Sequence, residues 1–413
     1  MLTSDAVDSL RKRVASRYSL ALRDVRVVFA PYRICPLGAH IDHQRGPVTA
    51  MALDRGILLG YAPQPDAVVT LASMNFAGEV RADLASVPPA LPDEWGNYPR
   101  GAIVALQQDH SLYCGLAGIV EGSAVEGGLS SSAALGVACL LALEDVNAIC
   151  ATPRTNIELD RYIENSYLGL KNGVLDQAAI LLSRRDHLTR IDCGTLCHEL
   201  WPRPATMPGF SVMIAHSGIR KALINTDYNR RVDECREAAR LLLEAAGRRK
   251  DHASLGNPVL GDLTPGEYLA FGDQLPPHLA RRAAHYFSES DRVDRGTIAW
   301  QAGDIAAFGK LVTESGESSI ANYECGSPPL IDLFRLIAAT PGVYGSRFSG
   351  AGFRGCCLAL VDSSRAESIA AEVQQAYHRL HPELADAAYV WLCDTADGAR
   401  IVSLDEFGAI EKP

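Results

Sequence analysis

A glycine- and serine-rich stretch over residues 126–135 has residue types that suit phosphate chemistry. It reads Glu-Gly-Gly-Leu-Ser-Ser-Ser-Ala-Ala-Leu, and an apolar run to Glu144 follows that predicts a buried helix. Gly127 and Gly128 allow a tight turn close to a ligand. A helix N-terminus offers unpaired N–H donors and positive partial charge, which favour a bound phosphate. A glycine turn with a serine N-cap is the alternative, and no Gly-Lys-Ser/Thr follows as in a Walker A loop.

A second candidate segment, residues 30–46, places many polar groups among prolines and glycines. Its charged and imidazole side chains are Arg33, His40, Asp42, His43 and Arg45. So many polar groups beside apolar strands favour a binding or catalytic site. The alternative is a solvated loop whose His and Asp side chains cap the next helix.

A carboxylate beside a glycine turn is the third candidate. Asp176 follows Asn-Gly-Val-Leu at 172–175 and leads into the apolar run 178–182. In this position it is either a helix cap or a general base, and the sequence by itself favours the cap.

Composition limits the classes of function. The chain has 413 residues, 47% hydrophobic and 21% charged, as in a water-soluble globular protein with two or three domains. A net charge of -10 argues against a broad nucleic-acid surface. The first residues lack the pattern of a secretory signal, and the apolar stretch 133–143 is too short to span a membrane. We therefore expect a cytoplasmic protein with no nucleic-acid or membrane partner.

The eleven cysteines are scattered and lie mostly in apolar runs, which predicts reduced thiols in the core. Cys193, Cys197 and His198 could ligate a metal. Because no second pair stands at the spacing of a zinc site, we expect none there.

Apolar periodicity predicts a mixture of helices and strands. We expect helices at 5–18, 95–108, 133–144, 155–168, 223–246, 279–289, 293–302, 305–315 and 365–379. We expect strands at 24–30, 48–62, 67–72, 116–123, 211–216 and 388–392, and two strands around a glycine turn within 345–362. Trp201-Pro202-Arg203-Pro204 interrupts the pattern, so we predict two domains, 1–205 and 206–413.

Three motifs occur in a fixed order along the chain, namely Arg33 to Asp42, Gly127 to Ala134 and the glycine turn 349–355. Together they resemble the GHMP small-molecule kinases, and the galactokinase-like branch in particular. The segments 95–98 and 172–177 also resemble that branch, so the resemblance covers nearly the whole chain. It implies a two-domain α/β (α+β) GHMP kinase fold, with an N-terminal phosphate-loop domain, a C-terminal ferredoxin-like domain and the active site in the cleft between them.

The resemblance also implies a role for each matching residue. Asp176 would be the base that takes the proton of the sugar's anomeric hydroxyl, and Arg33 would stabilise its charge and that of the transferring phosphoryl group. Ser131 and Glu164 would bind Mg²⁺, and Asp42 would accept hydrogen bonds from ring hydroxyls. Ala39, His40, Gly173 and Tyr228 would line the sugar pocket. ATP would contact Gly127, Gly128, Leu129, Ser130, Ser131, Ser132 and Ala133, with Trp95 and Ser73 near the adenine.

One departure from the branch concerns the substrate. Galactokinases have Gly-Glu-His-Thr-Asp-Tyr where residues 38–43 read Gly-Ala-His-Ile-Asp-His. That glutamate reaches the 6-hydroxyl of the sugar and would repel a carboxylate at C6, by roughly several kcal/mol when partly buried. Ala39 removes the repulsion. Residues 30–44 and 347–357 resemble the galacturonate-phosphorylating branch, so we expect ATP-dependent conversion of D-galacturonate to α-D-galacturonate 1-phosphate and ADP.

A cation should meet the C6 carboxylate. The candidates are Arg220, Lys221, Arg45 and His43, and for each the alternative is a solvated surface charge. Glu126 and Arg354 stand where many family members have glycine. We assign no definite role to either.

Two alternative functions stay open, and the first is another sugar kinase that acts on galactose, glucuronate or arabinose. Ala39 argues against galactose, and Asp42 favours the galacto arrangement over glucuronate without excluding it. The other alternative is a non-catalytic sugar and ATP sensor. Because the base, the arginine and both metal-binding residues are present, we favour an enzyme, and we expect it to be a monomer.

Overall fold

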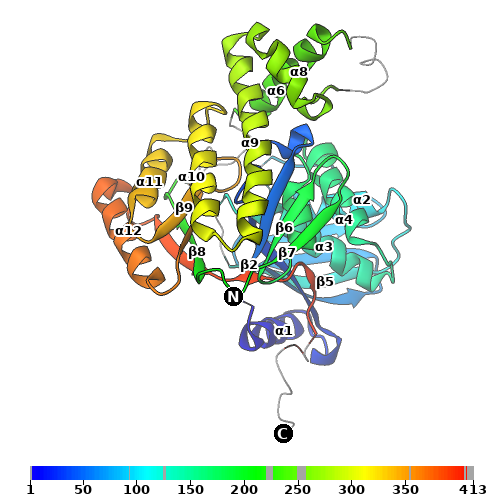
Figure 1. Ribbon diagram of the computed structural model, residues 1–413. Coiled ribbons are helices and arrows are strands. Elements are labelled where there is room, and N and C mark those ends of the chain that lie inside the picture. Colours follow the sequence, from blue (N-terminus) through cyan, green and yellow to red (C-terminus); the bar gives the residue numbers. More distant parts are fainter. Residues whose placement is uncertain are drawn as a thin grey trace.

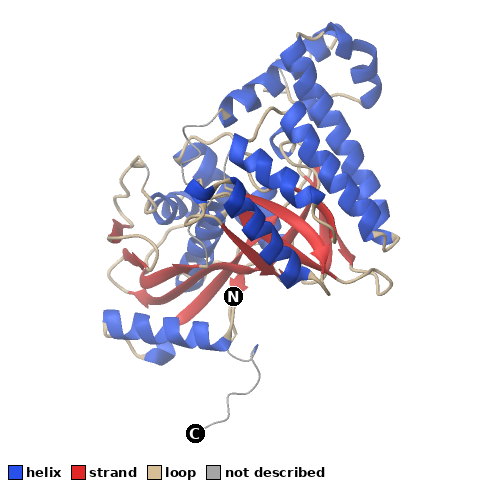
Figure 2. Ribbon diagram, turned by 90° about the vertical axis from the view of Figure 1, so that its left-hand side faces the viewer, coloured by secondary structure: helices blue, strands red, loops and turns tan. Residues whose placement is uncertain are grey.

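The fold is taken from a computed structural model that describes residues 2–92, 94–123, 127–219, 227–248, 257–352, 355–403 and 406. Over these residues the strands form two sheets, of nine and four strands. Helices lie on both sides of the strands (Figure 2). The helices α6 (Tyr228–Ala245) and α8 (Pro265–Phe271) project at one end of the molecule, together with part of α9 (Pro277–Gln301) (Figure 1).

The first sheet is built around three long buried strands. Its main path runs β13-β1-β2-β5-β3-β4, with β12 and β6 pairing with β2 and β7 pairing with β6. The strands are β1 (Arg26–Ile34), β2 (Pro47–Gln64), β3 (Val68–Ser73), β4 (Glu79–Asp83), β5 (Gly115–Gly122), β6 (His187–Asp192), β7 (His198–Pro202), β12 (Thr395–Ala396) and β13 (Arg400–Ile401). The pair β3–β5 is parallel and the other pairs are antiparallel.

Both faces of this sheet are covered by helices. Alternate residues of β1 point to opposite faces, so Val27 and Phe29 join one hydrophobic core and Val28 and Ala30 another. The first core is closed by α1 (Ser4–Tyr18). The other face is covered by α2 (Asn97–Leu106), α3 (Ser131–Val146), α4 (Pro153–Tyr162) and α5 (Leu175–Leu182).

The second sheet has the strand order β11-β8-β10-β9 and is antiparallel throughout. Its strands are β8 (Phe210–His216), β9 (Val343–Phe348), β10 (Cys356–Asp362) and β11 (Tyr389–Cys393). Helices α6, α8, α9, α10 (Ile305–Ala321) and α11 (Pro328–Ala339) connect β8 to β9, and α12 (Ala366–Leu380) connects β10 to β11. This is the ferredoxin-like arrangement that the resemblance implied.

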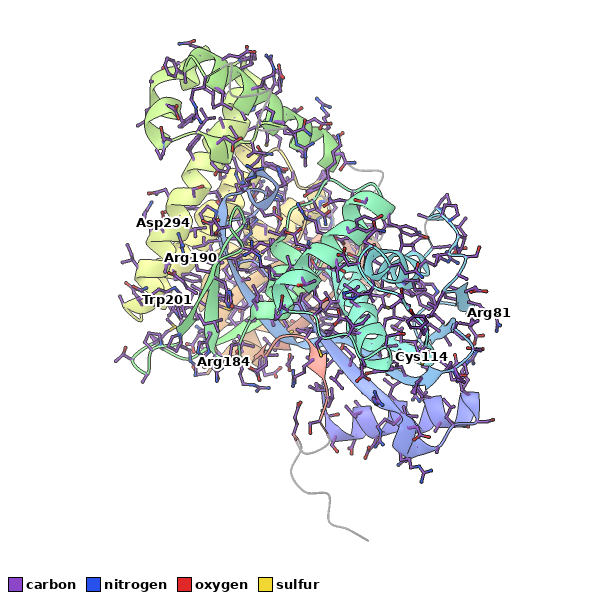
Figure 3. All side chains as sticks on the ribbon, turned by 90° about the vertical axis from the view of Figure 1, so that its right-hand side faces the viewer. Arg81, Cys114, Arg184, Arg190, Trp201 and Asp294 are labelled. Atoms are coloured by element: carbon purple, nitrogen blue, oxygen red, sulfur yellow. The ribbon has the colours of Figure 1, made fainter. Side chains whose placement is uncertain are left out.

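Polar contacts of the β6–β7 hairpin join the two halves of the chain. Arg190 pairs with Asp294 of α9 at 2.9 Å, and Trp300 Nε1 donates to the Trp201 carbonyl oxygen at 3.1 Å. Figure 3 shows this hairpin beside α9. The chain also returns at its end, because β12 and β13 pair with β2 and β1. A boundary near residue 205 assigns the two sheets to different halves of the chain, except that β12 and β13 of the first sheet come from the C-terminal half. The domain division stays a prediction.

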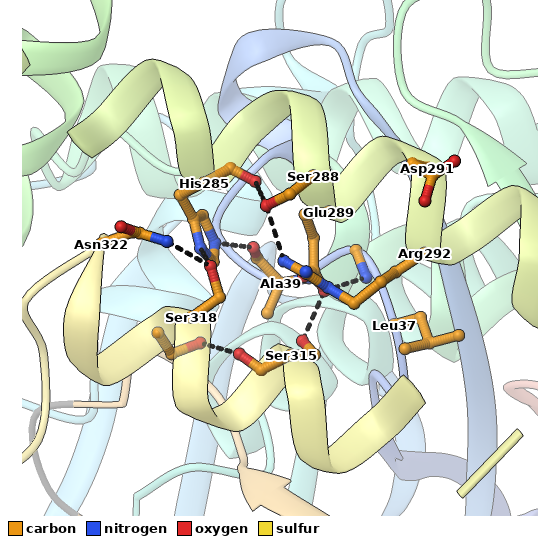
Figure 4. A network of polar contacts seen from close by, with 12 residues as sticks. Leu37, Ala39, His285, Ser288, Glu289, Asp291, Arg292, Ser315, Ser318 and Asn322 are labelled. Atoms are coloured by element: carbon orange, nitrogen blue, oxygen red, sulfur yellow. Dashed lines mark hydrogen bonds and ion pairs between the residues drawn. The ribbon is translucent and has the colours of Figure 1, made fainter. Parts of the chain in front are cut away.

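Two predicted helices prove to be one. Residues 279–289 and 293–302, which were predicted as two helices, both belong to α9 apart from Ala302. Glu289 and Arg292 are buried and point into a polar network, whereas Asp291 points away from it (Figure 4). The helix therefore continues through this polar segment and turns Glu289 and Arg292 inward.

Several short elements were not predicted. They are β4, β6, β7, β12, β13 and α11. The expected last strand, at 388–392, is followed by β12 and β13, which are two residues long and owe their conformation to pairing with the first sheet. All eleven cysteines are free, and eight of them are buried. No described helix combines the length and the apolar character needed to cross a membrane.

Candidate active site

The glycine- and serine-rich stretch forms a turn that leads into α3 at Ser131. Gly128 has a φ of 108° and Ser130 a φ of 57°, both in the left-handed region. Ser130 occupies the N-cap position of the helix, as the serine N-cap interpretation expected, but its hydroxyl makes no capping hydrogen bond. Its Oγ is buried and has no hydrogen-bond partner among the described residues. The Ser130 hydroxyl is therefore not used by the helix, and a ligand outside the helix could bind it.

The glycine turn of the third motif packs against this loop. Ser349 Oγ donates a hydrogen bond to the Gly128 carbonyl oxygen at 2.6 Å. A Cβ on Gly355 would lie 2.3 Å from the Gly127 carbonyl oxygen, and one on Gly128 would lie 2.8 Å from Cys356 Sγ. The two motifs thus need glycine because their backbones touch.

A cavity of about 600 Å³ is lined by residues from all three motifs and from both halves of the chain. Its predicted sugar-binding and catalytic residues are Arg33, Ala39, His40, Asp42, Asp176 and Tyr228. Its predicted phosphate- and metal-binding residues are Gly127, Gly128, Ser130, Ser131, Ser132 and Glu164. The structure therefore brings most of the predicted site residues into one space.

Some predicted nucleotide-binding residues do not line this cavity. Leu129 and Ala133 are buried in the hydrophobic core, and Trp95 packs against that core. Ser73 Oγ accepts hydrogen bonds from the backbone N–H groups of Asn75 and Phe76, at 3.1 and 3.2 Å. Phe76 itself is 48% exposed and does line the cavity. A lone aromatic in a turn gave no sequence signal for this position.

Three residues predicted to contact the sugar, Gly173, His43 and Arg45, do not line this cavity. Gly173 is packed against Asp42, because a Cβ there would lie 2.4 Å from Asp42 Oδ2. His43 and Arg45 line a different cavity. The other candidate cations, Arg220 and Lys221, lie outside the described residues, as do Glu126 and Arg354.

Arg33 and Asp176 form an ion pair across the cavity floor. The Nε and Nη2 atoms of Arg33 lie 2.8 and 2.7 Å from Asp176 Oδ1. Its Nη1 donates to the Gly128 carbonyl oxygen at 3.2 Å. The Asp176 side chain is 23% exposed, and it makes no capping bond to α5, so the helix-cap interpretation is wrong. One buried guanidinium group therefore connects the carboxylate to the phosphate loop.

Other carboxyl groups surround this pair. Burial, helped by the charge of Asp176, raises the pKa of Asp42 to about 6 and that of Glu164 to about 7. Asp42 Oδ2 accepts from the Leu175 N–H at 3.4 Å, and Glu164 Oε2 accepts from Asn172 Nδ2. Negative charge therefore accumulates on this side of the cavity, where a cation would be stabilised.

Asp160 lies behind these groups. It is fully buried, and neither carboxyl oxygen has a hydrogen-bond partner among the described residues. Burial, with the charges of Glu164 and Asp176, raises the pKa of Asp160 well above its ordinary value. The folded chain thus holds a proton that the unfolded chain releases, and stability falls as the pH rises from the ordinary towards the raised pKa.

We expect Asp160→Asn to raise the melting temperature at pH 8 by about 3–6 °C relative to the parent chain, and by less at pH 5. The substitution removes the titrating group but keeps its shape. Thermal unfolding across this pH range measures the difference. Asp294→Asn, at an exposed position, is the control and should show no such trend. A gain that is equal at both pH values would contradict the explanation.

The sugar-binding segment is held from behind by α9 and α10 (Figure 4). Glu289 Oε1 accepts from the backbone N–H groups of Gly38 and Ala39, at 2.8 and 3.3 Å. Its other oxygen, Oε2, accepts from Arg292 Nε at 2.7 Å. Although burial acts in the opposite direction, Arg292, His285 and Arg347 lower the pKa of Glu289 to about 2. A permanently charged carboxylate therefore fixes the turn that presents Ala39.

His285 completes this support. Burial lowers the pKa of His285 to about 4, so the ring is neutral at pH 7. Because the Ala39 carbonyl oxygen can only accept, the contact of 3.0 Å makes Nε2 the protonated nitrogen. Nδ1 then accepts from Ser318 Oγ at 2.9 Å. Both polar backbone groups of Ala39 are thus engaged by α9.

Family comparisons agree with this geometry. Residues 97–184 match the model described as "GHMP kinases N terminal domain", and residues 298–379 match "GHMP kinases C terminal". The chain belongs to the GHMP kinase family. The galacturonokinase of Arabidopsis thaliana is 48% identical over 97% of this chain and 99% of that protein. The galactokinase of Homo sapiens is 30% identical over 95% of this chain and 96% of that protein.

Solved structures give the same grouping. The crystal structure of Lactococcus lactis galactokinase complexed with galactose has a TM-score of 0.86 at 27% identity, covering 96% of this chain and all of that one. The Methanococcus jannaschii mevalonate kinase has a TM-score of 0.61 at 13% identity, which shows a shared fold. The two-domain GHMP kinase fold expected from the sequence is confirmed.

Proposed function

We propose that the chain is an ATP-dependent sugar-1-kinase whose acceptor is D-galacturonate, with α-D-galacturonate 1-phosphate and ADP as products. The observation that carries this proposal is the single cavity that joins the Arg33–Asp176 pair, the phosphate loop and Ala39. The near full-length similarity to a galacturonokinase supports the choice of sugar.

The reaction follows from the ion pair. Asp176 takes the proton of the anomeric hydroxyl as that oxygen bonds to the γ-phosphorus of ATP, and the bond to the bridging oxygen of ADP breaks. Arg33 contacts both the base and the carbonyl of Gly128. Its charge therefore lies between the nucleophile and the transferring group, where positioning and charge neutralisation provide most of the catalysis.

The phosphate loop and Glu164 suit ATP and Mg²⁺. Ser130 Oγ and the N-terminus of α3 offer donors to phosphate oxygens. Ser131 and Glu164 line the cavity with oxygen atoms, the ligands that Mg²⁺ prefers when phosphates fill the rest of its coordination shell. The ion would supply positive charge beside the carboxyl groups of Glu164 and Asp176, which line the same cavity. Phe76 offers a face for the adenine, and Trp95 and Ser73 stay predictions.

Specificity should depend on Ala39. We expect Ala39→Glu to lower kcat/KM for D-galacturonate by about 100-fold or more, because a carboxylate would face the C6 carboxylate of the substrate. Steady-state kinetics with D-galacturonate and D-galactose measures the change. Ala39→Gln is the matched control, since it adds the same bulk without charge. Equal losses of kcat/KM in the two variants would show that the size of the side chain at position 39, and not its charge, determines the choice of sugar.

Product analysis tests the proposed function. Purified chain, ATP, Mg²⁺ and D-galacturonate should yield ADP and one sugar phosphate, and ³¹P NMR should place the phosphate on C1. Galactose or glucuronate as the better acceptor would assign another sugar kinase. The absence of turnover with all three would favour the non-catalytic sensor. The cytoplasmic location, the monomeric state and Arg220 as the cation for C6 stay predictions.

A further inference from the structure

A second cavity, of about 620 Å³, adjoins the first. Asp42, Leu170 and Asn172 line both cavities and form the wall between them. Five cationic side chains line the second cavity, namely Arg45, Arg154, Arg161, Lys171 and Arg236. Only two carboxylates, those of Asp42 and Glu158, line it among the described residues. In a chain with a net charge of -10, such a gathering of cations favours an anionic ligand.

Three of the five cations are held by nearby acids. Lys171 Nζ lies 2.8 Å from both carboxylate oxygens of Asp233 on α6. Arg45 pairs with Asp262 at 3.2 Å. Arg161 pairs with Glu158 one turn earlier on α4. These groups contribute positive potential to the cavity, but part of their charge is already balanced.

Arg154 and Arg236 keep more of their hydrogen-bonding capacity. Arg154 Nη1 donates to the Thr195 carbonyl oxygen at 2.9 Å, which leaves its charge without an acidic partner among the described residues. Arg236 lies 3.9 Å from Asp233, an acid that Lys171 already holds at shorter distance. Its Nε is buried and has no hydrogen-bond partner in the described part of the chain. Two guanidinium groups, from α4 and α6, thus line one cavity without a carboxylate at hydrogen-bond distance among the described residues.

We propose that the second cavity binds a small molecule that carries a diphosphate group, and that this ligand weakens binding of the sugar in the neighbouring site. Each guanidinium group can hold one phosphate through two parallel hydrogen bonds, so two such groups fit two linked phosphates. A cavity of about 620 Å³ also has room for an organic group attached to the diphosphate.

The shared wall supplies the coupling, and this part of the inference rests on the proposed function. Asp42 faces both cavities, and a bound diphosphate would add negative charge beside the carboxylate that the sugar hydroxyls need. Two consecutive residues also link the cavities, since Asn172 of the wall donates to Glu164 in the first cavity and Lys171, which lines the second, pairs with Asp233 on α6. A ligand that draws Lys171 away from Asp233 would move this segment. Because linkage is reciprocal, bound sugar should weaken the anion equally.

Inorganic pyrophosphate is a suitable probe for the binding test. It is titrated calorimetrically into the full chain, with the phosphate loop filled by a nonhydrolysable ATP analogue and Mg²⁺ in constant excess. We expect one pyrophosphate per chain, bound at least about tenfold more tightly than orthophosphate. Equal affinity for the two anions, or no binding, would overturn the diphosphate assignment.

Variants locate the site. Arg154→Gln combined with Arg236→Gln should weaken pyrophosphate binding by about tenfold or more, while Arg295→Gln, at an exposed arginine that pairs with Asp291, should leave it unchanged. An unchanged affinity in the double variant would overturn the site. A melting temperature close to that of the parent shows that the double variant is folded.

Kinetics tests the coupling separately. Saturating pyrophosphate should raise the KM for the sugar about threefold or more in the parent chain and have no such effect in the double variant. An unchanged KM would overturn the coupling. Failure to phosphorylate D-galacturonate would contradict the proposed function without affecting the calorimetric result, so the two failures can be told apart.

Discussion

Asp176→Asn should lower kcat for sugar phosphorylation by about 10³-fold or more while galacturonate still binds within about threefold of the parent affinity. The amide has the shape of the carboxylate and can still accept a hydrogen bond from Arg33, whose donors reach Oδ1 at 2.7 and 2.8 Å. It cannot take the proton of the anomeric hydroxyl. The loss should therefore appear in kcat and not in sugar affinity.

Two measurements separate these quantities. Single-turnover phosphorylation gives the chemical step, and calorimetric titration of D-galacturonate into the variant gives the binding constant. Asp294→Asn serves as the control, because Asp294 is exposed and lies outside the cavity. Activity of the Asp176 variant within tenfold of the parent would remove Asp176 as the base.

Glu289→Ala should have the second large effect, on stability and on sugar binding together. The substitution leaves Arg292 and Arg347 buried without their shared carboxylate, which costs about 3–5 kcal/mol when a buried pair is broken. It also leaves the Gly38 and Ala39 N–H groups without their acceptor. We expect the melting temperature to fall by about 10 °C and, well below that temperature, the KM for the sugar to rise about tenfold.

The split between KM values identifies Glu289 as a positioning residue. A merely destabilised enzyme would lose active molecules and keep its KM values, whereas a displaced sugar-binding turn raises the KM for the sugar and spares that for ATP. Glu289→Gln keeps an acceptor for the backbone and should recover part of the sugar affinity. Glu317→Gln, at an exposed position of α10, is the control. Parallel changes in both KM values would contradict this role.

Sequence patterns predicted those parts of the site that are formed by residues close together in the chain. The phosphate loop and the glycine turn 349–355 are each encoded in a few consecutive residues, because tight turns and backbone contacts need glycine at fixed places. The pairing of Arg33 with Asp176 could not be predicted from local patterns, because the two residues are 143 positions apart in the sequence. Residue patterns alone favoured a helix cap for Asp176, and only the family resemblance suggested its partner.

The support behind Ala39 could not be predicted from patterns. The polar residues 290–292 separate the two helices predicted at 279–289 and 293–302, and polar side chains usually face water. In the folded chain Glu289 forms ion pairs with Arg292 and Arg347, so the charges of these buried side chains are balanced. Similarly, β12 and β13 take their conformation from the strands they join. Such features depend on tertiary neighbours that the local sequence does not specify.

Selection of a sugar acid by this site is tested most directly by measuring kcat/KM for D-galacturonate, D-galactose and D-glucuronate side by side with saturating ATP and Mg²⁺. The cavity places Ala39 beside His40 and Asp42, with no carboxylate at position 39 to repel a sugar acid. We predict that D-galacturonate exceeds both other sugars by about 100-fold or more. D-galactose as the best acceptor would contradict selection of a sugar acid, because Ala39 would then be a packing change without a role in charge selection.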